Sequence, residues 1–174
     1  MAGFKALLLD RDGVINIEKN YLYKAKDLEF VDGIFDLVRH FKTQGYKVVV
    51  VTNQSGIARG YYTEADLAKL HSFIADEFSK NGASIDAFYH CPHHPDFSGE
   101  CECRKPKSGM ILQAKKDLVL ELASSILVGD SERDIEAGLG AGVKQSYLLS
   151  NTATTSKATK IVKNLKEIID AHTK

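Results

Sequence analysis

Two short acidic segments stand at the ends of apolar runs. Asp10–Gly13 follows the leucines at 7–9, and Gly129-Asp130 follows the apolar run 125–128. Gly13 relieves backbone crowding, so that Asp10 and Asp12 can turn their carboxylates toward one site. A lone aspartate in such a place commonly caps a turn. Several together predict a catalytic site, because carboxylates can attack an electrophile, transfer protons and bind a hard cation.

Polar and basic side chains complete this set. Thr52 and Asn53 follow the β-branched run 46–51, and a hydroxyl and an amide can donate hydrogen bonds to phosphoryl oxygens. Arg104 and Lys105 supply two fixed positive charges that could oppose a phosphate. Each pair alone would indicate only a turn or a solvated basic surface. Together with the acids, they predict a site for phosphoryl chemistry.

Three cysteines lie close together in the sequence with neighbouring histidines. Cys91, Cys101 and Cys103, with His93 or His94, offer three thiols and an imidazole within one loop. This donor set fits a closed tetrahedral Zn²⁺ site, and a metal with four protein ligands is structural rather than catalytic. Buried structural cysteines are the alternative, but adjacent proline and charged residues favour a loop over a core. Spacing alone does not distinguish His93 from His94.

Hydrophobic periodicity indicates the elements that must position these residues. We expect strands at 5–9, 46–51, 85–89, 125–128 and 145–149, and helices at 33–43, 63–81, 108–117, 132–139 and 160–171. Strands that alternate with helices predict an α/β fold with a parallel sheet covered by helices on both faces. Ligands of such folds bind beyond the carboxyl ends of the strands, where the acidic, polar and basic residues all fall.

Composition limits the classes of protein that remain. The chain has 174 residues, 44% of them hydrophobic, and we expect one domain spanning 1–174. Its 23 basic and 23 acidic residues give a net charge of zero, which disfavours a nucleic-acid partner. Residues 1–9 are too short for a signal-peptide core, and no apolar run reaches membrane-spanning length. We therefore expect a cytoplasmic protein with no membrane partner.

The strand-end segments resemble the motifs of the haloacid dehalogenase (HAD) superfamily of phosphotransferases. The matching residues are Asp10–Gly13, Thr52-Asn53, Lys105 and Gly129-Asp130. The resemblance implies a Rossmann-like fold in which Asp10 attacks phosphorus and Asp12 protonates the leaving oxygen, then activates water. It also implies a catalytic Mg²⁺ bound by Asp10, Asp12 and Asp130, with Asp134 beside the ion without binding it.

Longer stretches narrow the resemblance to the D-glycero-D-manno-heptose 1,7-bisphosphate phosphatases. These stretches are residues 10–16 (DRDGVIN), 52–60 (TNQSGIARG), 91–95 (CPHHP) and 101–106 (CECRKP). The resemblance implies removal of the 7-phosphate, with the 1-phosphate retained, on the route to activated heptose for surface polysaccharide. It implies no large cap domain, a monomer, His93 as the fourth zinc ligand, and contacts from Thr52 and Lys105 to the transferred phosphoryl group. The implied substrate pocket comprises Glu18, Lys19, Asn20, Tyr21, Thr52, Asn53, Gln54, Ser55, Arg104 and Lys105.

Ser131 departs from the family pattern, which often has lysine directly after the second acidic segment. A serine there offers a neutral hydrogen bond in place of a cation. We expect another cation, Lys19 or Arg59, to compensate in the substrate pocket, and the preference for the α or β anomer stays open.

Other functions compete with this interpretation. Histidinol-phosphate phosphatases resemble the chain in the first motif and the cysteine loop, but the segment Gly56–Gly60 fits the heptose enzymes better. Polynucleotide 3′-phosphatases share similar motifs, yet they need a basic groove and no cysteine cluster. A phospho-sugar-binding protein without turnover is a third alternative, which metal-dependent phosphate release would exclude.

Overall fold

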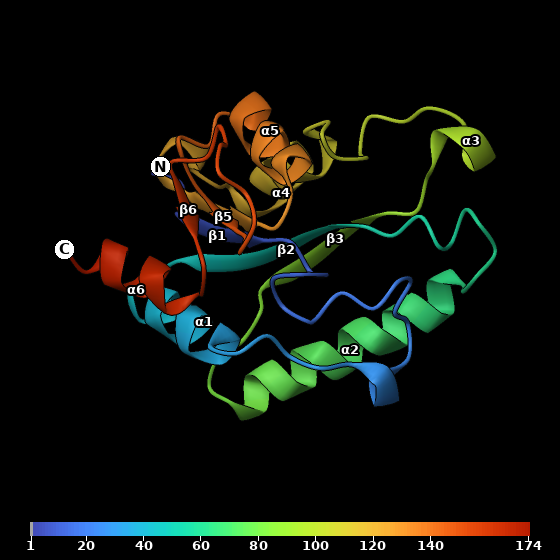
Figure 1. Ribbon diagram of the computed structural model, residues 1–174, viewed down its shortest axis with the longest axis horizontal. Coiled ribbons are helices and arrows are strands. Elements are labelled where there is room, and N and C mark those ends of the chain that lie inside the picture. The colour runs from blue at the N-terminus through green and yellow to red at the C-terminus, as the bar shows by residue number, and fades with distance from the viewer. Residues whose placement is uncertain (1) are drawn as a thin grey trace.

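The computed structural model describes residues 2–174, so Met1 of the expected domain lies outside the described residues. Its centre is a six-stranded parallel sheet in the order β3-β2-β1-β4-β5-β6 (Figure 1). The strands are β1 (Ala6–Leu9), β2 (Lys47–Asn53), β3 (Ala87–Cys91), β4 (Ile126–Gly129), β5 (Gln145–Leu149) and β6 (Lys160–Val162).

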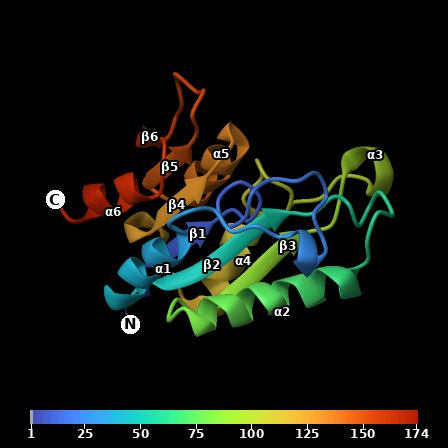
Figure 2. The ribbon, with the colours of Figure 1, turned by 60° about the horizontal axis from the view of Figure 1, so that its bottom comes forward.

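Helices cover both faces of the sheet. The helices are α1 (Ile34–Thr43), α2 (Glu64–Lys80), α3 (Pro95–Ser98), α4 (Gly109–Leu118), α5 (Glu132–Ala141) and α6 (Lys166–His172). Figures 1 and 2 show α1, α2 and α6 on one face and α4 and α5 on the other. In both views α3 lies at the end of the molecule remote from the two termini, near the carboxyl ends of β2 and β3. The expected α/β fold is confirmed.

The central strands alternate their side chains between two hydrophobic cores. In β1, Leu7 and Leu9 contribute to the core beneath α1, α2 and α6, whereas Ala6 and Leu8 contribute to the core beneath α4 and α5. All four side chains are fully buried. A strand buried on both faces has an unbroken apolar sequence, which is why β1 could be recognised from the sequence.

The order of the strands creates a crevice at the end of β1. From β1 the chain builds β2 and β3 outward on one side, then returns to place β4 on the other side of β1. Register pairs Leu9 with Val50 of β2 and with Val128 of β4, so these three strands end side by side. Parallel α/β sheets bind ligands at such a switch in strand order. Asp10, Thr52 and Asp130 are therefore brought to one edge by the topology.

Local differences from the expected elements fall mainly at the C-terminal end. The predicted helix 160–171 is wrong in its first half: Lys160–Val162 form β6, which pairs with β5, and only Lys166–His172 are helical. The third strand lies two residues later than expected, at Ala87–Cys91. Between β1 and α1, the one helical element in the described chain is a 3₁₀ turn at Ala25–Asp27, in line with the absence of a large cap. No helix of residues 2–174 has both the length and the apolar character needed to cross a membrane.

Candidate active site

A buried ion-pair network lies at the carboxyl ends of β1, β2 and β4. The Lys105 ammonium donates to Asp10 Oδ1 at 2.9 Å, to the Val51 carbonyl oxygen at 2.9 Å, and contacts Asp134 Oδ1 at 2.6 Å. These three acceptors match its three N–H bonds. Lys105 is 3% exposed, and despite burial the two carboxylates raise its pKa above the usual lysine value. The network therefore fixes one positive charge directly beside Asp10.

Three carboxylates of this network are grouped closely enough to hold a cation. Oxygens of Asp10, Asp130 and Asp134 lie within 4.8 Å of one another. Burial raises the pKa of Asp10 well above its usual value, and burial likewise raises the pKa of Asp130 to about 6. Lys105 holds the pKa of Asp134 below its ordinary value in spite of burial. One ammonium faces three acids, so a divalent cation with a preference for oxygen ligands fits the group in charge and in donor type.

Gly13 makes room for Asp130. Its backbone has a φ of 93°, and a Cβ at this position would lie 1.9 Å from Asp130 Oδ2. Any other residue would both strain the turn and push this carboxylate away from the group. The glycine after the first acidic segment is thus required by a residue more than a hundred positions later in the sequence.

The Asp12 carboxylate is held apart from that group by three donors. Its Oδ1 accepts from Arg11 at 2.7 Å and Asn16 at 3.0 Å, and its Oδ2 accepts from Gln54 Nε2 at 2.9 Å. Gln54 is itself oriented, because its Oε1 accepts from the hydroxyl of Tyr62. The structure therefore does not bring the Asp12 side chain into the cluster of Asp10, Asp130 and Asp134, and its predicted role as a magnesium ligand stays a prediction.

Arg11 and His71 support Asp12 and were not recognised from the sequence. Arg11 is fully buried, and its guanidinium bonds to the Leu22 carbonyl oxygen as well as to Asp12. His71 Nε2 lies 3.4 Å from Arg11 Nη1. Burial and the neighbouring Arg11 lower the pKa of His71 to about 3, so the ring is neutral at pH 7 and can accept this bond. The sequence signal was weak: His71 falls on the buried face of α2 beside Leu70.

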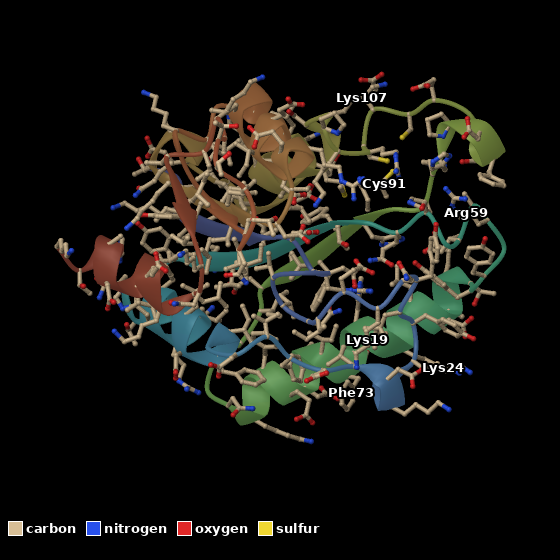
Figure 3. All side chains as sticks on the ribbon, in the orientation of Figure 1. Lys19, Lys24, Arg59, Phe73, Cys91 and Lys107 are labelled. Carbon is tan, nitrogen blue, oxygen red and sulfur yellow. The ribbon has the colours of Figure 1, made fainter. Side chains whose placement is uncertain are left out.

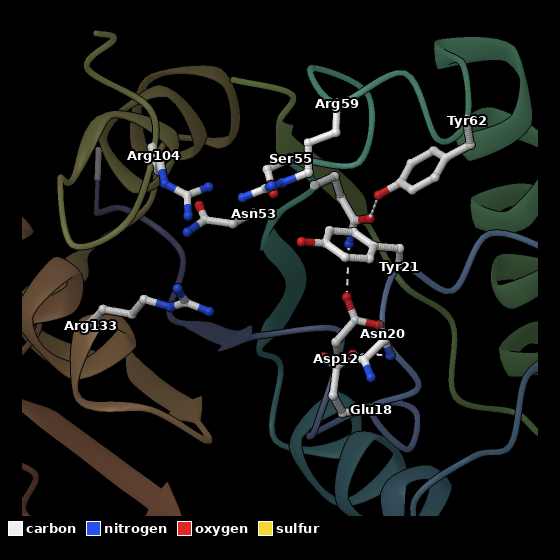
Figure 4. A pocket seen from close by; sticks show the side chains of 11 residues that line it. Asp12, Glu18, Asn20, Tyr21, Asn53, Ser55, Arg59, Tyr62, Arg104 and Arg133 are labelled. Atoms are coloured by element: carbon white, nitrogen blue, oxygen red, sulfur yellow. Dashed lines mark hydrogen bonds between the residues drawn. The ribbon is translucent and has the colours of Figure 1, made fainter. Parts of the chain in front are cut away.

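The acids open onto two adjoining spaces. An inner cleft of about 70 Å³ contains Asp10, Lys105, Asp130 and Asp134, and it leads to an outer pocket of about 250 Å³. Four residues line both spaces and mark the boundary between them: Asp12, Glu18, Asn53 and Arg133. The outer pocket is lined in addition by Asn20, Tyr21, Gln54, Ser55, Arg59, Tyr62 and Arg104 (Figure 4).

Most predicted substrate-binding residues therefore line the outer pocket. Lys105 lines the inner cleft instead, and Lys19 and Thr52 line neither space. The Lys19 amine donates to the Asp27 carbonyl oxygen at 2.9 Å and faces Glu29. Figure 3 shows it close to Lys24 and away from Arg59. Thr52 is 1% exposed, and its hydroxyl oxygen accepts from Gln54 at 2.9 Å. Burial raises the pKa of Glu18, the acid at the pocket boundary.

Arg59 joins the loops around the pocket mouth. Its guanidinium carbon lies 5.6 Å from the ring centre of Tyr21 and 4.7 Å from that of Phe97 in α3. Such cation–π contacts hold the three segments together without neutralising the charge. Tyr21 has a left-handed backbone with a φ of 60°, and Asn20 before it has a φ of 43°. Adjacent non-glycine residues in this region are uncommon, and here they present both side chains to the pocket.

The cysteine cluster directly precedes Arg104 and Lys105 in the chain. The sulfurs of Cys91, Cys101 and Cys103 lie within 3.6 Å of one another. Burial raises the pKa of the Cys91 thiol. In the described chain the ring of His93 is not within the compact group that the three sulfurs form, although its carbonyl oxygen accepts from Arg104 at 3.3 Å. Figure 3 shows Cys91 at the end of β3 and Lys107 in the loop that contains the other two cysteines.

Ser131 and Arg133 open α5 and have different surroundings. The hydroxyl and backbone amide of Ser131 both donate to Asp134 Oδ2, each at 3.1 Å. Ser131 therefore orients the acid that binds Lys105 rather than facing the outer pocket. Arg133 lines both spaces, and no local pattern in the sequence distinguishes it from a solvated surface arginine of α5.

Comparisons with known proteins agree with this geometry. The HAD-hydrolase-like family model matches residues 102–171. A D-glycero-alpha-D-manno-heptose-1,7-bisphosphate 7-phosphatase from Campylobacter jejuni is 49% identical over 95% of this chain and 94% of its own. A D-glycero-beta-D-manno-heptose-1,7-bisphosphate 7-phosphatase from Helicobacter pylori is 47% identical over 95% of both chains.

Solved structures share the whole fold. A D,D-heptose 1,7-bisphosphate phosphatase from B. bronchiseptica, crystallised with magnesium and phosphate, superposes with a TM-score of 0.86 at 30% identity, and the match covers 98% of both chains. A HAD-like phosphatase from Mesorhizobium loti superposes with a TM-score of 0.89 at 30% identity, covering 98% of this chain and 87% of its own.

Proposed function

Since the chain belongs to the D-glycero-D-manno-heptose-1,7-bisphosphate 7-phosphatase family of the HAD superfamily, we propose that it hydrolyses the 7-phosphate of that sugar bisphosphate and leaves heptose 1-phosphate. The observation that carries the proposal is the pairing of Asp10 with Lys105 in a cleft too small for a sugar, opening onto a pocket lined by arginines. Relatives named for the α and for the β anomer are 49% and 47% identical to this chain, so the proposal covers the sugar without its anomer.

Asp10 is the nucleophile of the proposed reaction. One of its carboxylate oxygens forms a bond to phosphorus as the bond from phosphorus to the sugar O7 breaks, which gives an aspartyl-phosphate. Asp12 donates a proton to the departing O7 and then accepts one from water. That water attacks the same phosphorus, and the Asp10 oxygen leaves as a carboxylate with release of inorganic phosphate.

Lys105 and Thr52 act on the charge of the transferred group. Lys105 is held rigidly by Asp134 and Val51, so its ammonium opposes phosphate charge without a cost of reorganisation. Thr52 lies beneath the pocket, where its hydroxyl is close to Gln54 and, through Gln54, to Asp12. Ser131 supports Lys105 indirectly by fixing the Asp134 carboxylate.

A Mg²⁺ ion fits the acidic group. Asp10 and Asp130 would hold it, since one carboxylate oxygen of Asp134 already bonds to Lys105 and the other accepts from Ser131. When bound, the ion screens the carboxylate from the phosphate anion and so permits nucleophilic attack. The B. bronchiseptica structure was crystallised with magnesium, which supports the choice of ion.

We extend the proposal to the pocket and to the whole protein. The sugar and its remaining phosphate bind in the outer pocket, against Glu18, Asn20, Tyr21, Asn53, Gln54, Ser55, Arg59 and Arg104. The enzyme works as a cytoplasmic monomer in which one domain acts on a small sugar phosphate, without a nucleic-acid or membrane partner. The net charge of zero supports the last point.

The three cysteines hold a structural Zn²⁺ in this proposal. Soft thiolates within 3.6 Å of one another suit zinc, and His93 is the proposed fourth ligand. His94 has another role, because its Nδ1 accepts the backbone N–H of Asp96 at the start of α3. The site lies one residue before Arg104, so zinc would fix the loop that delivers Arg104 and Lys105 to the phosphate.

Cys101→Ala is expected to lose zinc and much of the activity while the sheet stays folded. Metal analysis of the purified wild type should give about one zinc per chain that survives removal of Mg²⁺, because thiolates prefer the softer metal. Ser98→Ala, at the last residue of α3 between Cys91 and Cys101 and without a metal role, is the matched control and should retain zinc. Full activity in a demonstrably zinc-free wild-type protein would contradict the positioning role.

A panel of phosphate esters tests the proposed function. Phosphate release in the presence of Mg²⁺ is measured with both anomers of heptose 1,7-bisphosphate, fructose 1,6-bisphosphate and histidinol phosphate. We expect the highest kcat/KM with a heptose bisphosphate, and loss of release when Mg²⁺ is chelated. A clear preference for histidinol phosphate would overturn the proposal in favour of that related activity.

A further inference from the structure

Arg133 occupies the boundary between the inner cleft and the outer pocket. It is the second residue of α5, and α5 starts directly after the turn that carries Asp130. Arg133 lines both spaces, as only Asp12, Glu18 and Asn53 also do in the described chain. Figure 4 shows its guanidinium directed into the pocket, on the same side as Arg104.

Among the residues that the structure describes, Arg133 and Arg59 are the cations lining the site whose side chains form no hydrogen bond or ion pair, and the Arg59 guanidinium lies instead over the rings of Tyr21 and Phe97. Lys105 binds two carboxylates, Arg11 binds Asp12, and the Arg104 guanidinium donates to a backbone carbonyl oxygen. No ion pair or hydrogen bond of the Arg133 side chain is found among residues 2–174. The Asp12 and Glu18 carboxylates lie across the pocket from it (Figure 4). Two guanidinium groups, those of Arg104 and Arg133, thus point into the outer pocket from one side (Figure 4).

Convergent arginines are suited to a dianion. Each guanidinium presents paired N–H donors that match two oxygens of a phosphate, and two such groups from different elements would repel one another unless an anion lies between them. In the inner cleft, Lys105 already opposes the reacting phosphate. Arg133 is exposed, in contrast to Lys105, and so belongs to the solvent side of the site.

We infer that Arg133, with Arg104, binds the phosphate that the substrate retains, and so makes the site selective for a bisphosphate over the matching monophosphate. This inference rests on the proposed function for the nature of the substrate. It assigns to α5 a specificity role in addition to carrying the acid that positions Lys105.

The test compares Arg133→Gln with wild type on heptose 1,7-bisphosphate and on heptose 7-phosphate, which lacks the retained group. Loss of a charge-assisted hydrogen bond should lower kcat/KM for the bisphosphate about 10- to 100-fold, and should change kcat/KM for the monophosphate by less than about threefold. Arg133→Lys, which keeps the charge without the fork, should recover part of the loss. Arg39→Gln, at an exposed arginine of α1 that bonds to Asp36, is the matched control and should behave as wild type.

A second readout separates this inference from the proposed function. Fructose 1,6-bisphosphate and fructose 6-phosphate are tested as competitive inhibitors of 4-nitrophenyl phosphate hydrolysis, which requires no turnover of heptose. If wild type does not cleave the heptose bisphosphate but Arg133→Gln loses its preference for the bisphosphate inhibitor, the proposed function is wrong and this inference stands. An unchanged preference for bisphosphates in Arg133→Gln, or an equal loss with all phosphates, overturns the inference whatever the natural sugar.

Discussion

Asp10→Asn should abolish phosphate release while leaving the protein folded. An amide has nearly the shape of a carboxylate but cannot form an acyl phosphate, so we expect less than about 10⁻⁴ of wild-type kcat. The fold should tolerate the change, because the substitution removes a buried charge that Asp130 and Asp134 repel. Lys105 keeps two acceptors, Asp134 at 2.6 Å and the Val51 carbonyl oxygen at 2.9 Å, and is not left unpaired.

The measurements are steady-state phosphate release, circular dichroism and acid-quenched trapping of labelled phosphoenzyme. Asp170→Asn makes the same chemical change at an exposed residue of α6 whose carboxylate pairs with Lys166, and it should retain both activity and the trapped intermediate. Activity of Asp10→Asn near that of wild type would move the nucleophile to another residue. Loss of the circular dichroism signal would show instead that Asp10 is needed for folding.

The part of the site that the sequence predicts well is the part fixed by strand ends. In a parallel sheet, every carboxyl end lies at one edge, so an apolar run followed by a polar residue determines both an element and a location. Asp10 follows β1 in this way, Thr52 follows the buried core of β2, and Asp130 follows β4. The sheet brings all three residues to one edge. Their location at this edge can be predicted without knowledge of side-chain packing.

Residues that act through packing could not be predicted in the same way. Arg11 is fully buried, although arginine is ordinarily a surface residue, because Asp12, the Leu22 carbonyl oxygen and His71 bond to its two terminal nitrogens. Its Nε has no hydrogen-bond partner among the described residues. Leu22 lies in a loop and His71 lies on α2, and no local pattern links either of them to Arg11. Gly13 is a similar case, because the Asp130 carboxylate occupies the space that a side chain at position 13 would need.

The wrong prediction of one helix over 160–171 has a different cause. The apolar residues of 160–171 have a spacing compatible with one helix, but Lys160–Val162 pair with Tyr147–Leu149 along the edge of the sheet. Strand pairing is a non-local contact and outweighs weak local preferences in a segment with β-branched residues. Ile161 and Val162 are therefore part of strand β6, and helix α6 begins only at Lys166.

Asp12→Asn should slow turnover by about 10² to 10⁴, the usual contribution of general acid–base catalysis. The effect should depend on the leaving group. Departure of a sugar alkoxide requires a proton, whereas an aryl oxide, whose conjugate acid has a pKa of about 10 or below, departs more easily. A plot of log kcat/KM against leaving-group pKa should therefore be steeper for the variant than for wild type.

The hydrogen bonds around Asp12 can accommodate asparagine except at one contact, the bond from Gln54. The asparagine oxygen can keep the bonds from Arg11 and Asn16 that Asp12 Oδ1 accepts, but its amide would face the Nε2 donor of Gln54. Such a mismatch disturbs binding to a similar degree for every substrate, so it lowers the plot without changing its slope. An equal loss for alkyl and aryl phosphates would assign the defect to this disturbed contact, and would contradict proton donation by Asp12.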